Sequence, residues 1–193
     1  AYRHAYETWG DDGPRQEWVE RRLDSPRHNR ADWWVLTADG EVVSALGCYD
    51  LAFRYRDSRV DGIGIGAVHT RPDARGQGYA SRLCRRVHDN YADDGYALAL
   101  LFTDIAPDFY RELGYEVCSD RQFTTDNLRD LAESGPRGGL HRIDPEAQLE
   151  ELAVWYDDAH ETRGLTLDRD SEYWSHTIDE SPDDRFFGVS RPG

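Results

Sequence analysis

The fold of this chain is decided by the stretch Val68-His69-Thr70-Arg71-Pro72-Asp73-Ala74-Arg75-Gly76-Gln77-Gly78-Tyr79-Ala80. A glycine-spaced apolar run leads into it and an amphipathic run follows it, which predicts a strand, a glycine-rich turn and the start of a helix. Backbone N–H groups at such a turn, together with the positive end of the helix dipole, bind phosphate well. Gly76 and Gly78 let a ligand approach the backbone, and Arg75 adds a fixed positive charge.

The composition of the chain indicates a folded protein. Its 193 residues suit one full domain and part of another, and 38% of them are hydrophobic. No apolar run is long enough to cross a bilayer, and no signal-peptide pattern opens the chain. Cys48, Cys84 and Cys118 are widely spaced in apolar contexts, which favours reduced thiols over a disulfide or a metal site. We therefore expect a cytoplasmic protein.

The chain is strongly acidic, with a formal net charge of -15. This charge argues against nonspecific binding to nucleic acid or to an anionic membrane, so neither is expected as a partner. All 23 basic residues are Arg, and most of the acidic residues are Asp. Such an acidic shell is typical of proteins that work in concentrated salt, where ions screen the self-repulsion. The composition therefore predicts a halophilic protein.

Periodicity and turn residues predict the remaining elements of the chain. Before residue 125, they are helices at 1–9 and 15–23, a loop at 26–30, strands at 33–37, 42–56 and 58–70, a helix that ends near 93, a strand buried on both faces at 96–103, a short helix at 108–113 and a strand at 115–123. After residue 139, they are a strand at 140–143, a helix at 145–161 with Asp144 as its N-cap, a helix at 170–178 and a strand at 185–190.

A glycine-x-glycine turn alone has several interpretations. The chain lacks the Gly-Lys-Ser/Thr of a P-loop NTPase and the glycine spacing of a dinucleotide-binding fold. About thirty residues after the turn comes a second motif, Phe109-Tyr110-Arg111-Glu112-Leu113-Gly114-Tyr115. With Arg75 to Ala80, this motif resembles the GNAT superfamily of acyl-CoA-dependent N-acetyltransferases. The resemblance implies an α/β (α+β) fold whose mixed, mostly antiparallel central sheet is flanked by helices and splays to admit acyl-CoA.

The arrangement of the whole chain resembles one group within that superfamily. The phrase Thr70 to Gly76, the glycine-rich strand before it and the trailing segment are similar to the enhanced-intracellular-survival (Eis) group, in which two acetyltransferase-like domains stand in tandem. Arg169 to Trp174 also matches the start of the second domain in that group. The resemblance implies an acetyltransferase domain at 1–125 that lacks its first strand, a linker at 126–139, and a partial second GNAT-like domain at 140–193.

The resemblance also implies where acetyl-CoA binds. Val68, His69 and Thr70 would pair with its pantetheine arm, and its pyrophosphate would bind at Arg75, Gly76, Gln77, Gly78, Tyr79, Ala80 and Ser81. Gly62, Gly64 and Gly66 give the arm close access or simply pack one face of the sheet. Tyr110 would lie near the thioester sulfur, where a phenol suits a general acid that protonates the leaving thiolate.

The acceptor and the general base are less well defined. Tyr6 and Trp9, with Trp18, would lie on helices that line the acceptor pocket, although core packing is an alternative role for each. His69, Asp61 and Asp104 remain candidates for the base. No metal-ligand spacing occurs, so no metal is expected.

We expect direct transfer of acetyl to a primary amine, either a small molecule or a lysine side chain, and the acidic surface favours a cationic acceptor. The alternative is a noncatalytic acyl-CoA-binding sensor or scaffold domain. The sequence also leaves open a homo-oligomer formed through the full-length protein.

Overall fold

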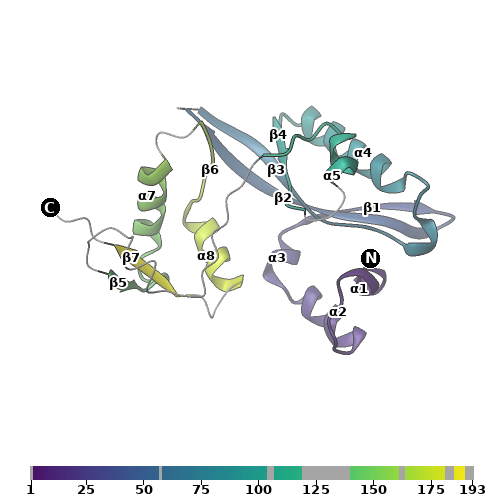
Figure 1. Ribbon diagram of the computed structural model, residues 1–193, viewed down its shortest axis with the longest axis horizontal. Helices are drawn as coiled ribbons and strands as arrows, with labels where there is room; N and C mark the ends of the chain where they lie inside the picture. Colours follow the sequence, from purple (N-terminus) through teal and green to yellow (C-terminus); the bar gives the residue numbers. More distant parts are fainter. Residues whose placement is uncertain are drawn as a thin grey trace.

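The computed structural model describes residues 2–56, 58–103, 107–118, 140–160, 164–180 and 185–189. The first part of the chain contains α1 (Tyr2–Trp9), α2 (Arg15–Leu23), α3 (Pro26–Asn29), β1 (Asp32–Ala38), β2 (Glu41–Tyr55), β3 (Ser58–Thr70), α4 (Tyr79–Asp93), β4 (Leu98–Leu100) and α5 (Pro107–Arg111). The second part contains β5 (Leu140–Ile143), α7 (Leu149–His160), β6 (Leu165–Leu167), α8 (Ser171–Glu180) and β7 (Phe186–Val189). Figure 1 shows their arrangement.

The main sheet is built around the long hairpin of β2 and β3. Its strand order is β1-β2-β3-β4, and β6 also pairs with β2. β1 occupies the first half of one edge of β2, and β6 pairs with Phe53–Tyr55 near the other end. Only β3 and β4 are parallel, so the predicted mixed, mostly antiparallel sheet is confirmed. β6 was not expected from the sequence, and it brings a strand from beyond residue 140 into this sheet.

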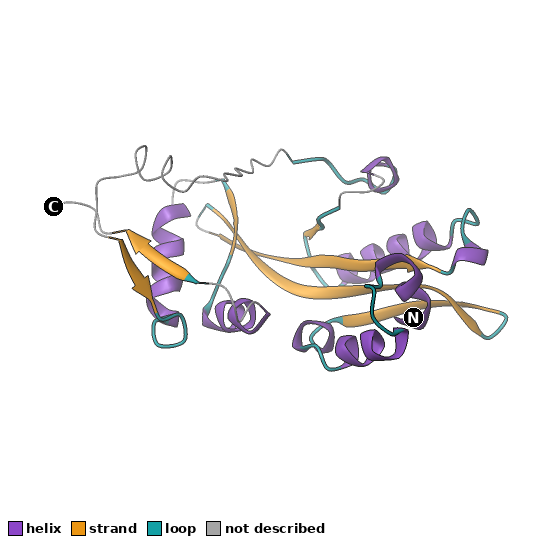
Figure 2. Ribbon diagram, turned by 60° about the horizontal axis from the view of Figure 1, so that its bottom comes forward, coloured by secondary structure: helices purple, strands orange, loops and turns teal. Residues whose placement is uncertain are grey.

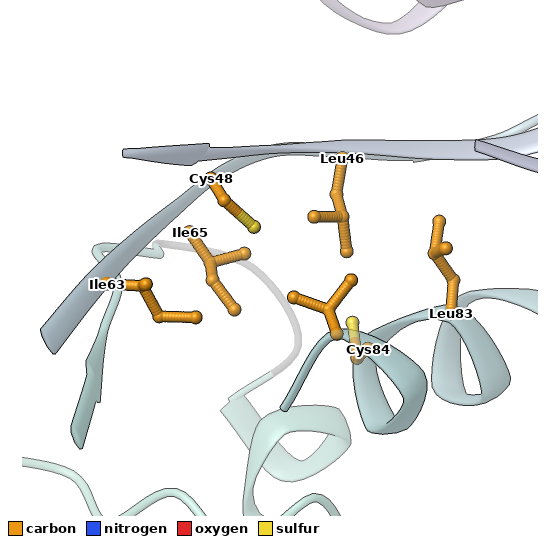
Figure 3. Close-up of a cluster of buried hydrophobic side chains, with 7 residues drawn as sticks. Leu46, Cys48, Ile63, Ile65, Leu83 and Cys84 are labelled. Carbon is orange, nitrogen blue, oxygen red and sulfur yellow. The ribbon is translucent and has the colours of Figure 1, made fainter. Parts of the chain in front are cut away.

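One face of the sheet packs against α4, because alternate residues of β2 and β3 are apolar. The buried cluster at this contact consists of Leu46, Cys48, Ile63, Ile65, Leu83, Cys84 and Val87. Figure 3 shows the side chains from the strands and those from the helix pointing toward one another. Burying each Leu or Ile side chain contributes about 1.5–3 kcal/mol. This packing fixes α4, and with it the turn at its N-terminus, against the sheet.

The opposite face of β3 presents glycines at alternate positions. A Cβ at Gly62 would lie 2.9 Å from the carbonyl oxygen of Leu98, and one at Gly66 would lie 3.2 Å from Cε2 of Tyr49. Side chains of β2 therefore lean over this stripe, which favours packing as the role of these glycines. The helices α1, α2 and α3 lie on this side, whereas α4 and α5 lie on the other (Figures 1 and 2).

The second part of the chain has a small core of its own. β5 and β7 form an antiparallel pair, and Ile143, Leu152 and Trp174 form a buried cluster with α7 and α8. Arg54 of β2 links the two parts, because its Nη2 lies 2.9 Å from Asp168 Oδ1 and 3.3 Å from Asp157 Oδ2. Figure 2 shows β5, β7, α7 and α8 grouped at one end of the molecule.

Several predicted elements differ from the structure. The predicted loop at 26–30 is wrong, because α3 begins at Pro26 and the N–H of Asn29 donates to the carbonyl of Ser25 at 3.1 Å. Proline is common both in loops and in the first turn of a helix, and here it begins the helix. The strand at 96–103 shortens to Leu98–Leu100, which is only half-buried. Residues 115–118 form no strand, and the rest of the predicted strand at 115–123 lies outside the described residues.

The helix predicted at 145–161 begins later, at Leu149. Turns occupy residues 145–148 before it. The N–H of Ala147 nevertheless donates to Oδ1 of Asp144 at 3.3 Å, as expected of an N-cap. The remaining predicted helices and strands lie within a few residues of their observed positions.

Candidate active site

The predicted phosphate-binding turn connects β3 to α4 through a short 3-10 helix, η1 (Pro72–Ala74). Gly76 and Gly78 have φ values of 75° and 74°, in the left-handed region that favours glycine. No described atom lies within 4 Å of a Cβ built at either glycine, so conformation rather than crowding requires glycine here. Gly78 is the N-cap of α4 and makes no side-chain cap, which leaves the first N–H groups of the helix for a ligand.

Several arginine side chains lie at or next to this turn. Nε of Arg75 donates to the carbonyl of Thr70 at 3.2 Å, and the Arg75 side chain is exposed. The guanidinium of Arg82, in the first turn of α4, lies 6.0 Å from the centre of the Tyr79 ring. Arg71 has Nε 2.6 Å from Asp73 Oδ1, so much of its charge is neutralised. Arg75 and Arg82 therefore supply the positive charge near the N-terminus of α4.

β3 carries a β-bulge shortly before this turn. Ala67 and Val68 together lie opposite the single residue Leu46 of β2, because the register of the two strands shifts there. Ala67 has a φ of 51°, a left-handed conformation that costs a residue with a Cβ about 1–3 kcal/mol. A bulge also takes backbone groups out of regular strand pairing and bends the strand. Sequence reasoning did not find this bulge, because nothing in the residue Ala67 itself signals it.

The bulge borders a pocket with a volume of about 430 Å³, which is the size of a small-molecule site. The pocket lies on the glycine face of the sheet, between β3 and the N-terminal helices. Seven aromatic side chains line it, and they are Tyr2, Trp9, Trp18, Trp33, Tyr49, Phe102 and Tyr110. The other lining residues are Ala5, Arg22, His28, Ala45, Ile65, Gly66, Ala67, Val68, His69, Leu101 and Thr103.

Tyr110 lies in α5 and reaches this pocket from the end of the sheet that carries β4. Its ring packs edge-to-face against Phe109 and Tyr115, with ring centroids 4.9 Å and 5.8 Å apart. Burial, and to a lesser extent the neighbouring Cys84, raises the pKa of Tyr110 above its ordinary value. The phenol is therefore protonated at neutral pH, which is the state that a proton donor requires.

The two residues predicted to bind the acceptor lie in different places. Trp9 lines the pocket, and its ring centroid is 5.7 Å from that of His69 in an edge-on contact. Tyr6 is not among the lining residues. Its hydroxyl donates to the carbonyl of Gly13 at 2.5 Å, and its ring packs against Trp18. Tyr6 thus supports a residue of the pocket wall, and its predicted contact with the acceptor stays a prediction.

The three candidates for the general base also differ in where they lie. His69 is buried and lines the pocket, and its carbonyl accepts a hydrogen bond from Ser44 Oγ at 2.9 Å. Asp61 is exposed, forms an ion pair with Arg59 at 3.1 Å and is not among the lining residues. Asp104 lies outside the described residues. Of these candidates, the structure therefore places His69 in the same pocket lining as Tyr110, and the role of His69 as a base stays a prediction.

Within the described ranges, no group of three or more His, Cys, Asp or Glu side chains could hold a metal ion. None of the helices that the structure describes combines the length and apolarity needed to cross a membrane. Cys48 and Cys84 are buried free thiols, and Cys118 is an exposed one.

Several pocket residues were not singled out from the sequence. Tyr2, Arg22, His28, Trp33 and Tyr49 come from five separate elements, and no local pattern indicates that they share a cavity. The aromatic richness of the first helix was the only available signal, and it pointed to α1 as a whole.

Comparisons with known proteins extend this description. The sequence model of the acetyltransferase (GNAT) domain family matches residues 1–118. A GCN5-related N-acetyltransferase from Kribbella flavida superposes with a TM-score of 0.68 at 22% identity, covering 98% of this chain and 49% of that protein. A conserved protein of unknown function from Enterococcus faecalis, a probable N-acyltransferase, superposes with a TM-score of 0.69 at 17% identity, covering 100% of this chain and 52% of that protein.

The two superpositions show that the folds are similar and nothing further, because the sequence identities are only 22% and 17%. The chain spans about half the length of the Kribbella and Enterococcus proteins. No curated protein sequence shows significant similarity to the chain.

Proposed function

Because this chain belongs to the GNAT acetyltransferase family, whose members use acetyl-CoA, we propose that it transfers an acetyl group from acetyl-CoA to a primary amine. One observation carries the proposal. Tyr110, the bulged part of β3 and the N-terminal helices all line the same 430 Å³ pocket. The phosphate-binding turn follows β3 directly, so a cofactor bound at the turn can extend along β3 to this pocket.

In this proposal, the N-terminus of α4 binds the pyrophosphate of acetyl-CoA. The N–H groups after Gly78 and the positive end of the helix dipole favour an anion there, and Arg75 adds charge. The pantetheine arm pairs with the backbone of β3 at the bulge. The residues assigned to the cofactor are Val68, His69, Thr70, Arg75, Gly76, Gln77, Gly78, Tyr79, Ala80 and Ser81.

The chemical step is a direct transfer. The neutral amine nitrogen of the acceptor attacks the thioester carbonyl, and the carbon–sulfur bond then breaks to leave the amide and the thiolate of CoA. Backbone N–H groups at Ala67 and Val68 stabilise the oxyanion that forms on the carbonyl oxygen. Tyr110 donates its phenolic proton to the thiolate, and His69, a buried histidine of the pocket lining, accepts the proton that the amine loses.

The test of this function is the substitution Tyr110→Phe. It removes the proposed acid and keeps the ring, so turnover should fall by about tenfold or more while the affinity for acetyl-CoA is retained. Thiol release from acetyl-CoA with a panel of amines measures turnover, and calorimetry measures cofactor binding.

Tyr115→Phe is the matched control. Its ring packs against Tyr110, its hydroxyl contacts His88 Nε2 at 2.8 Å, and it does not line the pocket. An unchanged rate for Tyr110→Phe would remove this residue from the mechanism. Binding of acetyl-CoA without thiol release for every amine would favour the noncatalytic sensor instead.

The division of the chain into domains is a second part of the proposal. The predicted linker at 126–139 lies outside the described residues, and the proposal is that the residues after it begin a second acetyltransferase-like domain, in the tandem arrangement of the Eis group. The separate core around Ile143, Leu152 and Trp174 supports a distinct unit after residue 140. The structure of the full-length protein tests this arrangement, and a different fold after residue 140 would contradict it.

A further inference from the structure

We propose that the acceptor is a primary amine on a flat, aromatic body that also carries a carboxylate, and that Arg22 binds this carboxylate. The inference rests on the proposed function, because it names the class of amine that the same pocket accepts. It differs from the expectation based on composition, which favoured a cationic acceptor.

The charge of the pocket differs from that of the chain. The formal net charge is -15, yet none of the described residues that line the pocket is Asp or Glu. Arg22 contributes a positive charge to this lining. The acidic surface acts on a cation mainly within a Debye length, about 10 Å in dilute salt and less in concentrated salt. A polyamine or a lysine-rich segment would therefore meet no carboxylate among these residues once inside the pocket.

Arg22 is held in a position that suits anion binding. It is half-buried in the last turn of α2, and its guanidinium carbon lies 5.0 Å from the ring centroid of Trp18, which is only 4% exposed. Stacking on an aromatic ring orients a guanidinium and leaves its edge free to bind a carboxylate in a bidentate manner. Arg22 takes part in none of the ion pairs among the described residues.

Aromatic rings form the wall around this charge. The ring of Tyr2 packs edge-on against Trp33 at 5.3 Å, and the ring of His28 stacks on Trp33 at 5.9 Å. The indole N–H of Trp33 is already used, since it donates to the carbonyl of His28 at 2.8 Å. The wall therefore offers mainly ring surface, which favours a flat apolar body in the ligand.

The size of the pocket suits a ligand that contacts residues on two of its walls. Arg22 and Tyr110 both line the pocket, and its volume of about 430 Å³ is that of a site for a small molecule. The amine then lies near Tyr110 and β3, where aromatic faces tolerate an ammonium before it loses its proton. The carboxylate lies at Arg22. A molecule with both groups satisfies the pocket better than a polycation does.

The experiment uses two pairs of amines that differ only in the carboxylate. They are 3-(aminomethyl)benzoate with 3-(aminomethyl)benzamide, and 4-(aminomethyl)benzoate with 4-(aminomethyl)benzamide, and spermidine serves as the polycation. In the wild-type chain, we expect kcat/KM for at least one carboxylate to exceed that of its amide by about tenfold or more. Spermidine should be the poorest acceptor.

Substitutions then assign this preference to Arg22. In Arg22→Gln, the preference for the carboxylate should disappear, mainly through KM, and Arg22→Lys should restore part of it. Arg21→Gln is the matched control, because Arg21 is the neighbouring residue, pairs with Asp11 and does not line the pocket. It changes the net charge equally and should keep the preference. Circular dichroism verifies that each variant is folded.

Calorimetric binding of the same five amines to the CoA-loaded chain separates the two proposals. If no amine is acetylated but the carboxylates bind through Arg22, the proposed function is overturned, and of this inference only the carboxylate site at Arg22 holds. If amines are acetylated but spermidine or the amides are preferred, or if Arg22→Gln leaves the preference unchanged, this inference is overturned and the proposed function stands.

Discussion

Replacing Gly78 by Ala should destabilise the chain by about 1 kcal/mol. Gly78 has φ 74° and ψ 13° at the N-cap of α4, a left-handed conformation that costs a residue with a Cβ about 1–2 kcal/mol. The lower entropy of the unfolded alanine chain offsets part of this cost. No described atom lies within 4 Å of the new Cβ, so steric crowding adds nothing.

Urea denaturation followed by tryptophan fluorescence measures this change. With a slope of about 2 kcal/mol per molar urea, the midpoint should fall by about 0.5 M. Gly78→Asn provides the control, because asparagine adopts the left-handed region more readily than alanine. Its midpoint should lie between those of the wild type and the alanine variant. If the alanine variant unfolds at the wild-type midpoint, or if both variants lose the same stability, the conformational explanation is refuted.

The same two variants separate stability from cofactor binding. A side chain at position 78 extends into the space where the proposed pyrophosphate approaches the N-terminus of α4. Both variants should therefore raise KM for acetyl-CoA, including the asparagine variant that retains more stability. An unchanged KM in both would argue against a phosphate at this turn.

Two further predictions concern the core. Gly62→Ala should lower the melting temperature more than Gly64→Ala. A Cβ at position 62 would lie 2.9 Å from the backbone oxygen of Leu98, whereas a Cβ at position 64 would meet a flexible side chain. Equal melting temperatures of the two variants would contradict this prediction. Burial raises the pKa of Cys48 to about 12 and that of Cys84 to about 11, from an ordinary 9.0. Their contribution to stability is full below pH 9 and is lost as the pH rises to 11–12, by about 1.4 kcal/mol per pH unit for each thiol. Denaturation at pH 8, 9 and 10 measures this decline, which Cys84→Ala should weaken, and a flat profile would disprove it.

Much of the fold could be predicted from the sequence, because its signals are local. The glycines at 76 and 78, the alternating strands and the amphipathic helix each depend on residues that are close in sequence. The mixed sheet followed from the family resemblance carried by two motifs. The boundaries were less accurate where one residue has two meanings, as Pro26 does at the start of a helix. The strand β6 was missed because three residues carry too little pattern.

The site was predictable only in part, for a physical reason. The proposed donor side depends on the turn before α4, whose backbone conformation requires glycine, and so residues close in sequence indicated it. The acceptor side depends on which side chains meet across the sheet. Arg22 and Trp33 are far from Tyr110 in the chain, and only packing of the N-terminal helices on the glycine face of β3 brings all three into one pocket. The left-handed Ala67 likewise results from the shifted register of two strands, which no single residue encodes.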